Sequence, residues 1–155
     1  MGEPVLRADP IVKHLHGAFC RDAGRKELLQ IAAQGIADAG PPYTSVYMYM
    51  LNGPGDALTL ESYVGRETEH SSIPVGRGLC GRAVTQRRDL TIPDVAAESS
   101  YLACNLETKS ELIVLIRRHD EILGQIDIDS DVPDGFDDAE LAAVKDVADA
   151  LAALL

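Results

Sequence analysis

Two cysteines and three acidic residues are the side chains of this sequence most suited to chemistry. Cys80 and Cys104 are two of its three cysteines. A cysteine thiolate is a nucleophile and can be oxidised, so each of them is a candidate catalytic residue. Glu111, Asp127 and Asp129 follow within the same half of the chain. Together they could hold a small cation, since buried charges are stable only when they are partnered.

The three acids belong to segments 111–117 and 122–129, whose patterns predict two β-strands. Side chains alternate between the faces of a strand, so Asp127 and Asp129 share one face. If the strands form a hairpin with an odd number of loop residues, Glu111 lies opposite Asp129. Like charges in opposed positions destabilise a sheet, and a cation bound between them would relieve the repulsion. The alternative is that these acids form the solvent side of a strand near a sheet edge.

The cysteines also allow alternative interpretations. Cys80 is expected at the start of a short helix over 79–87, where a helix N-terminus would lower its pKa below the value of about 8.5 for free cysteine; alternatively it is a buried thiol. Cys104 lies in the irregular segment 94–110, and long irregular segments in compact domains are often functional; alternatively it is an ordinary loop cysteine. Nearby carboxylates would raise its pKa, so a thiolate there needs a compensating positive charge. Cys20 is interpreted as a small buried apolar residue.

Composition limits the classes of partner. The net charge of −11 disfavours nucleic acid, because an acidic surface repels phosphate. No apolar run approaches the roughly 20 residues of a membrane span. The first ten residues contain acids and two prolines and lack an apolar segment, so we expect a cytoplasmic protein rather than a secreted one. The odd number of cysteines argues against a disulfide framework, and no metal-ligand spacing predicts a metal site.

The remaining segments predict the elements that must position these residues. Helix patterns occupy 9–21, 28–36, 79–87 and 141–154, and further strand patterns occupy 45–51, 57–64 and 90–92. Asp9 is expected to cap the first helix, and Asp137 with Glu140 resembles a capping box before the last one. This order is typical of a single α+β domain with a mostly antiparallel sheet. The first and last helices could lie side by side on one face of the sheet, or pair between two copies.

Four motifs, IPVGRGLCG, IPDV, ACNLETKSE and GQIDIDS, resemble the GAF domain family. More narrowly, they resemble the free methionine-(R)-sulfoxide reductases within that family. The resemblance implies a six-stranded antiparallel sheet flanked by helices on both faces, with a ligand pocket between one face and long loops. It also implies a GAF domain over 43–155, with the N-terminal helices of 1–42 packed on it. Such domains are often homodimers through their terminal helices.

For the reductases, the resemblance implies that the thiolate of Cys104 attacks the sulfoxide sulfur, releases methionine and becomes a sulfenic acid. Cys80 is then the candidate resolving thiol, which forms a disulfide that thioredoxin or another thiol reductant opens, without any bound cofactor. Acids that match Glu111, Asp127 and Asp129 bind the ammonium group of the free amino acid. The resemblance therefore assigns to these acids the same role that strand alternation suggests.

The sequence departs from the reductases at three points. The run around Cys104 that usually reads His-Ile-Ala-Cys-Asp is YLACN over residues 101–105 here. His70 stands ten residues before Cys80, where the reductases carry a further cysteine, and it is interpreted as a surface loop residue. The chain also has no tryptophan, whereas the family uses one near its first strand to line the pocket for the substrate's methyl group. The alternative function is a stand-alone GAF domain that senses a small amine or amino acid, with its cysteines incidental or redox-sensing.

Overall fold

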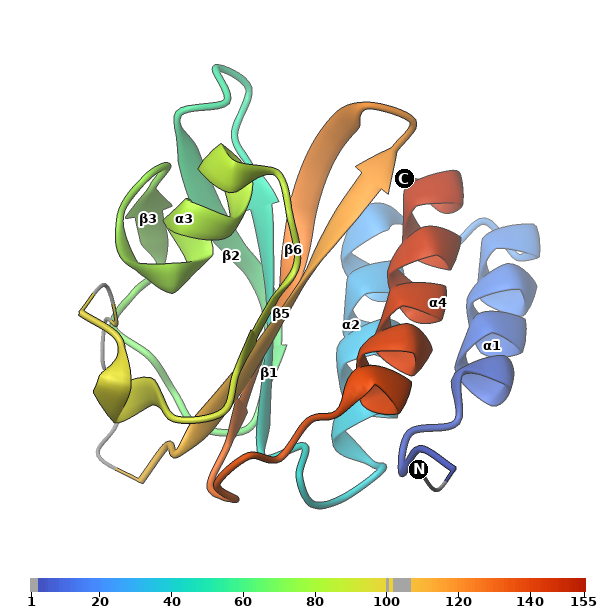
Figure 1. Ribbon diagram of the computed structural model, residues 1–155. Helices are drawn as coiled ribbons and strands as arrows, with labels where there is room; N and C mark the ends of the chain where they lie inside the picture. The colour runs from blue at the N-terminus through green and yellow to red at the C-terminus, as the bar shows by residue number, and fades with distance from the viewer. Residues whose placement is uncertain (1–2, 100, 102–106) are drawn as a thin grey trace.

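The computed structural model describes residues 3–99, 101 and 107–155. Within these residues a six-stranded sheet lies between helices (Figure 1). The helices are α1 (Ala8–Cys20), α2 (Arg25–Ala37), α3 (Gly78–Gln86) and α4 (Asp138–Leu154), with a short 3-10 helix, η1 (Val95–Ala97). The strands are β1 (Ser45–Leu51), β2 (Ala57–Val64), β3 (Ser72–Pro74), β4 (Leu90–Ile92), β5 (Ser110–Arg118) and β6 (Glu121–Ser130). The predicted α+β class is confirmed.

The sheet has the strand order β3-β2-β1-β6-β5-β4, and every neighbouring pair is antiparallel. β1 and β6 are therefore central strands with a partner on each side. Strand β3 is a difference from the sequence patterns, which predict no strand between residues 64 and 90. It pairs with β2 at the sheet edge and is only three residues long, too short to show an alternating pattern.

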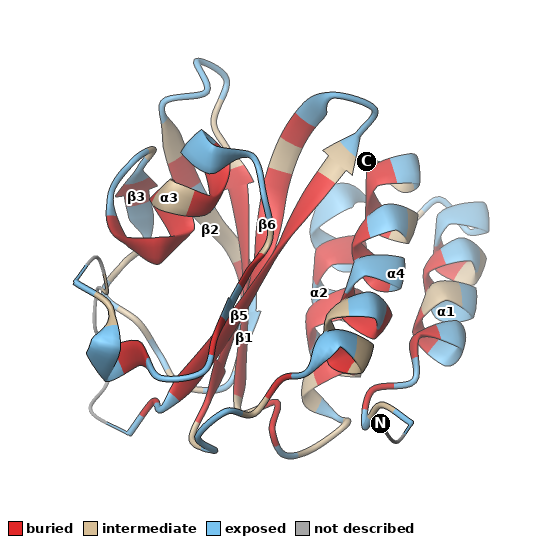
Figure 2. Cartoon of the chain, viewed as in Figure 1, coloured by how far each residue is buried: buried red, intermediate tan, exposed pale blue. Residues whose placement is uncertain are grey.

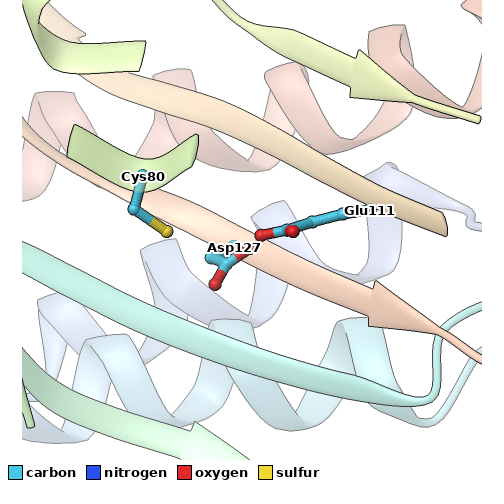
Figure 3. A group of neighbouring side chains, drawn as sticks. All are labelled: Cys80, Glu111 and Asp127. Carbon is cyan, nitrogen blue, oxygen red and sulfur yellow. The ribbon is translucent and has the colours of Figure 1, made fainter. Parts of the chain in front are cut away.

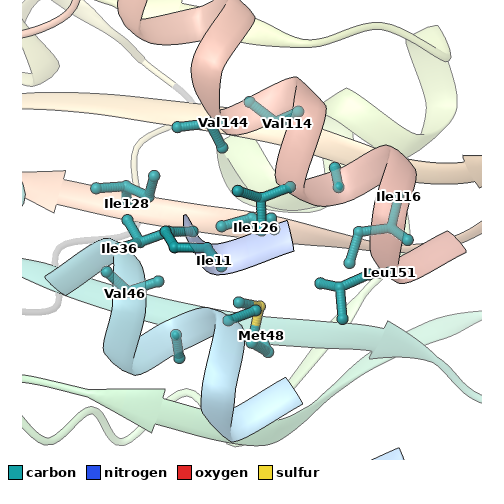
Figure 4. Packing of buried hydrophobic residues seen from close by; sticks show 14 of the residues in the cluster. Ile11, Ile36, Val46, Met48, Val114, Ile116, Ile126, Ile128, Val144 and Leu151 are labelled. Carbon is teal, nitrogen blue, oxygen red and sulfur yellow. The ribbon is translucent and has the colours of Figure 1, made fainter. Parts of the chain in front are cut away.

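One face of the sheet carries the larger hydrophobic core. Helices α2 and α4 pack directly on this face, and α1 lies outside them (Figure 1). Figure 4 shows Val46 and Met48 of β1 meeting Ile126 and Ile128 of β6 beneath these helices. Each of these side chains is fully buried, which stabilises the fold by roughly 1.5–3 kcal/mol per residue. The helices are buried on the side that faces the sheet and exposed on the other (Figure 2).

Helices α1 and α4 lie side by side within one chain, as one of the two sequence interpretations expected. Pairing of terminal helices between two copies stays a prediction. Two details of α1 differ from expectation. The helix follows Arg7 without a side-chain cap, so Asp9 lies inside the first turn. Cys20 is exposed, because it lies off the buried stripe of the helix that contains Ile11 and Leu15.

The start of α4 holds the N-terminal segment in place. Asp137 caps the helix by accepting a hydrogen bond from the backbone N–H of Glu140 at 3.0 Å. The predicted reciprocal bond is replaced by longer-range contacts of the Glu140 carboxylate. It accepts hydrogen bonds from the N–H groups of Val5 and Leu6 at 2.7 and 3.2 Å, and from the hydroxyl of Tyr43 at 2.6 Å. One buried carboxylate thus joins the N-terminal segment, α4 and the start of β1.

The other face of the sheet is covered by α3, η1 and the loops around them (Figure 1). A second, smaller hydrophobic cluster lies between α3 and this face. No helix among the described residues combines the length and the apolar character needed to cross a membrane. The two faces of the sheet differ in the side chains that they bury, since the face toward α3 also carries buried acidic residues.

Candidate functional site

The β5–β6 hairpin has the register that the sequence predicted at its acidic end. Glu111 pairs with Asp129, and Ile113 pairs with Asp127. Across the other neighbour of β6, Tyr47 of β1 pairs with Asp127. The three acids are therefore brought together on the face that α3 covers.

The turn of the hairpin differs from the predicted loop with an odd number of residues. Arg118 pairs with Glu121 across a two-residue turn, and a bulge between Ile116 and Arg117 supplies the odd residue. The bulge breaks strict alternation beyond it. As a result Ile122 packs in the cluster below α3, whereas its neighbour Leu123 packs against the helix-side core.

All three acids are almost completely buried. Glu111, Asp127 and Asp129 expose only 4%, 3% and 2% of their surfaces. The interpretation of these residues as the solvent side of an edge strand is wrong, because β6 is a central strand and its acidic face lies under α3 and the neighbouring loops. Buried acids at such a position need hydrogen-bond donors or a cation to offset their lost hydration.

Cys80 lies directly above the acids, in the first turn of α3. Figure 3 shows its sulfur and the Glu111 carboxylate both directed toward Asp127. One ligand atom from each of these three residues lies within 4.8 Å of the others. Gln125 of β6 fixes this arrangement, because its Nε2 donates a hydrogen bond to the backbone oxygen of Cys80 at 2.9 Å. The structure thus brings together Cys80 and the predicted acids.

Of the two interpretations of Cys80, the buried thiol is confirmed and the lowered pKa is wrong. Burial raises the pKa of this thiol well above its ordinary value, and the charges of Asp127 and Glu111 raise it further. At neutral pH Cys80 is therefore a thiol rather than a thiolate.

Burial also raises the pKa of Asp127, although hydrogen bonds with Glu111 and Cys80 oppose the rise. The pKa of Asp129 is raised well above its ordinary range by burial, then by the charges of Asp127 and Asp131, with Arg66 opposing. No described residue donates a hydrogen bond to Asp127 Oδ1 or Asp129 Oδ2. The cluster therefore holds protons tightly and presents two buried acceptor atoms to a ligand.

These residues line a cavity of about 20 Å³, which is large enough for a water-sized group. Tyr49, Tyr101 and His70 form part of its wall. His70 lies in a loop, as expected, but it is half-buried and lines the cavity rather than standing free in solvent. The loop that carries it is held by the hydroxyl of Tyr49, which donates a hydrogen bond to the backbone oxygen of His70 at 2.7 Å.

Sequence reasoning missed Gln125, Tyr49 and Tyr101 as parts of the site. Strand alternation contained the signal for two of them, because Gln125 shares a face with Asp127, and Tyr49 lies two residues after Tyr47 on β1. No local pattern marks Tyr101. Cys104, the predicted nucleophile, lies outside the described residues.

Comparison with known proteins identifies the family. A family model for the GAF domain matches residues 24–155. The chain belongs to the GAF domain family. This GAF domain has the six-stranded antiparallel sheet and the arrangement of helices that the sequence motifs implied. The division of the chain at residue 42 stays a prediction.

Relatives of this GAF domain include reductases and proteins named only for the domain. It is 37% identical over 68 residues to GAF domain-containing protein A of Dictyostelium discoideum, across 44% of this chain and 43% of that protein. It is 35% identical over 85 residues to the free methionine-R-sulfoxide reductase of Escherichia coli K12, across 55% of this chain and 51% of that enzyme. The matches thus span about half the length of these curated relatives or less.

A solved structure gives broader coverage. The type II free methionine-R-sulfoxide reductase from Thermoplasma acidophilum is 36% identical and superposes with a TM-score of 0.79. The superposition covers 84% of this chain and 91% of that one. The likeness to a reductase therefore extends over most of this GAF domain.

Proposed function

We propose that this GAF domain is a thiol oxidoreductase that reduces free methionine-(R)-sulfoxide. The observation that carries the proposal is the buried trio of Glu111, Asp127 and Asp129 beside the thiol of Cys80. Such a group of acids is best satisfied by a small cation with several N–H donors, which describes the ammonium group of a free amino acid. The reductases among the relatives support the choice of sulfoxide.

Ligand recognition follows from the two carboxylate oxygens that no described residue reaches, one on Asp127 and one on Asp129. An ammonium group donates to both and offsets the buried negative charge of the acids. Hydrogen bonds to charged groups stabilise a complex by about 1.5–3 kcal/mol each. Because the cavity is only about 20 Å³, a whole amino acid requires its lining to open during binding.

The proposed chemistry starts at Cys104. Its thiolate attacks the sulfoxide sulfur, and with one proton taken up the products are methionine and a sulfenic acid on Cys104. The thiol of Cys80 then condenses with the sulfenic acid, forming a disulfide and releasing water. Two electrons and two protons from thioredoxin or another dithiol restore both thiols, so no bound cofactor is required. The raised pKa of Cys80 predicts that this resolving step is slow.

The test is turnover of free methionine-(R)-sulfoxide with dithiothreitol as reductant, followed by chromatography of methionine. The wild type and Cys20→Ser are expected to be active, because Cys20 is exposed on α1 far from the acids. Cys104→Ser is expected to abolish turnover. Asp127→Asn is expected to raise KM at least tenfold, which corresponds to about 1.4 kcal/mol of lost binding.

A binding module without catalysis is the second candidate function. It is favoured by the high pKa of Cys80, which suits a buried thiol better than a resolving one. In that case methionine sulfoxide or another amine raises the melting temperature of the wild type but not of Asp127→Asn, and no methionine forms. Absence of both binding and turnover would contradict either function.

A further inference from the structure

Three side chains from separate elements converge at one buried point. Cys80 comes from α3, Glu111 from β5 and Asp127 from β6, and one ligand atom from each lies within 4.8 Å of the others (Figure 3). Each residue is at least nine-tenths buried. The described residues leave Oδ1 of Asp127 without a hydrogen-bond donor.

One sulfur and two carboxylate ligands at this spacing suit a divalent transition-metal ion such as Zn²⁺. Around a tetrahedral Zn²⁺, bonds of about 2.3 Å to sulfur and about 2.0–2.2 Å to oxygen place the ligand atoms roughly 3.5 Å apart. In the protein the three ligand atoms lie within 4.8 Å of one another, a spacing on the same scale. A cavity of about 20 Å³ beside the three residues is suited to an ion or a water molecule rather than to an amino acid.

We propose that Cys80, Glu111 and Asp127 form a binding site for a thiophilic divalent cation such as Zn²⁺, and that this ion excludes an ammonium ligand from the acids. The sulfur ligand distinguishes the site from those of Mg²⁺ and Ca²⁺, which take oxygen ligands. On binding, a sulfur–metal bond replaces the sulfur–hydrogen bond and the proton passes to solvent. No electron transfer is involved.

The earlier expectation of no metal site rested on the absence of ligand spacing in the sequence. The three residues lie 31 and 16 positions apart in the sequence and meet only through the packing of α3 on the sheet. Metal binding itself is independent of the proposed function. Inhibition by the metal rests on that function, because it requires that the acids bind the substrate.

Cobalt(II) is the probe for the test, because thiolate-to-cobalt charge-transfer absorption reports sulfur ligation directly. The reduced, metal-free full chain with the Cys104→Ser substitution is titrated with Co²⁺, and Zn²⁺ is then added. We expect one equivalent of Co²⁺ to give the absorption and Zn²⁺ to abolish it. The further substitution Cys20→Ser should leave it unchanged, whereas Cys80→Ser should remove it.

Asp127→Asn provides a second variant in case Cys80→Ser is poorly folded. It keeps the thiol and the side-chain shape, and is expected to weaken Co²⁺ binding at least tenfold. Absence of the absorption, or its full retention in Cys80→Ser, would overturn the metal site.

The inhibition is measured separately on the wild type. We expect added Zn²⁺ to raise the apparent KM for methionine-(R)-sulfoxide and EDTA to restore it. Turnover that is insensitive to Zn²⁺ at concentrations that saturate the site would refute the exclusion of the ligand. A wild type without turnover refutes the proposed function instead, and the cobalt titration still decides the metal site.

Discussion

Asp127 and Asp129 occupy surroundings that disfavour their charged forms. Both lie under α3 with one carboxylate oxygen that no described donor reaches, and burial raises the pKa of each. Asp131, only two residues further on, shows the opposite behaviour, because a two-pronged ion pair with Arg66 lowers its pKa. The charged forms of Asp127 and Asp129 thus destabilise the fold, whereas that of Asp131 stabilises it. Substitutions of Asp127 and Asp131 can therefore be compared directly.

We predict that Asp127→Asn stabilises the free protein at pH 7 by on the order of 1 kcal/mol, because the amide removes the cost of a buried charge. Asp131→Asn should instead destabilise it by up to about 1 kcal/mol, since its ion pair is partly exposed. Urea unfolding of both variants measures the two effects. The prediction is wrong if both substitutions change the free energy of unfolding in the same direction.

The raised pKa values of Asp127 and Asp129 should also make the stability of the protein depend on pH. A carboxyl group whose pKa is raised by folding contributes most to stability below its unfolded pKa of about 4, and this contribution is lost as the pH rises through the raised value. The free energy of unfolding of the wild type should therefore fall relative to the double variant Asp127→Asn, Asp129→Asn as the pH rises above about 4. Urea unfolding at several pH values, with a chelator present, measures the difference. A pH-independent difference would be inconsistent with raised pKa values.

At the scale of elements, the placement of Cys80 depends on how closely α3 approaches the sheet. Gly81 makes this approach possible, because a Cβ atom there would lie 2.7 Å from the backbone nitrogen of Gly76 and 2.8 Å from the oxygen of Pro74. The backbone N–H of Gly76 also donates to the oxygen of Gly81 at 3.1 Å. The helix therefore has backbone contact with the turn before it.

We predict that Gly81→Ala displaces α3, lowers the free energy of unfolding by about 1–3 kcal/mol and exposes Cys80. Gly17→Ala is the matched control. A Cβ atom at Gly17 would meet only the mobile end of the Arg21 side chain at 3.3 Å, and alanine is favoured over glycine in a helix by about 1 kcal/mol. Urea unfolding and alkylation of Cys80, followed by mass spectrometry, check both variants. Equal alkylation rates in the two variants would count against the displacement.

The sequence predicted the helices, strands and strand register better than the burial and electrostatic environment of individual side chains. Alternation and hairpin logic placed Glu111 opposite Asp129 correctly, because register and face are local properties of paired strands. The lowered pKa considered for Cys80 has the wrong direction, because burial under tertiary packing and then acids from strands distant in sequence raise it. His70 was missed for the same reason, since a loop polar residue becomes part of a cavity wall only through tertiary packing.

At the scale of the whole molecule, the sheet separates two sets of contacts. The larger core fills the side under α2 and α4, while the smaller cluster and the acidic cavity lie on the side under α3. Neighbouring residues of β6 serve both sides, as Ile126 and Ile128 pack toward the helices while Asp127 between them faces the cavity. Alternation along a single strand is sufficient to keep the two environments apart.

This separation has a consequence for how such a protein can diverge. The side chains that choose a ligand contribute little to the principal core, so natural selection can exchange them while the chain still folds. Lineages that descend from one ancestor can then acquire new specificities through a few substitutions on the same face. A protein engineer could follow the same route by diversifying only Tyr49, His70 and Tyr101 to select binders of other amines.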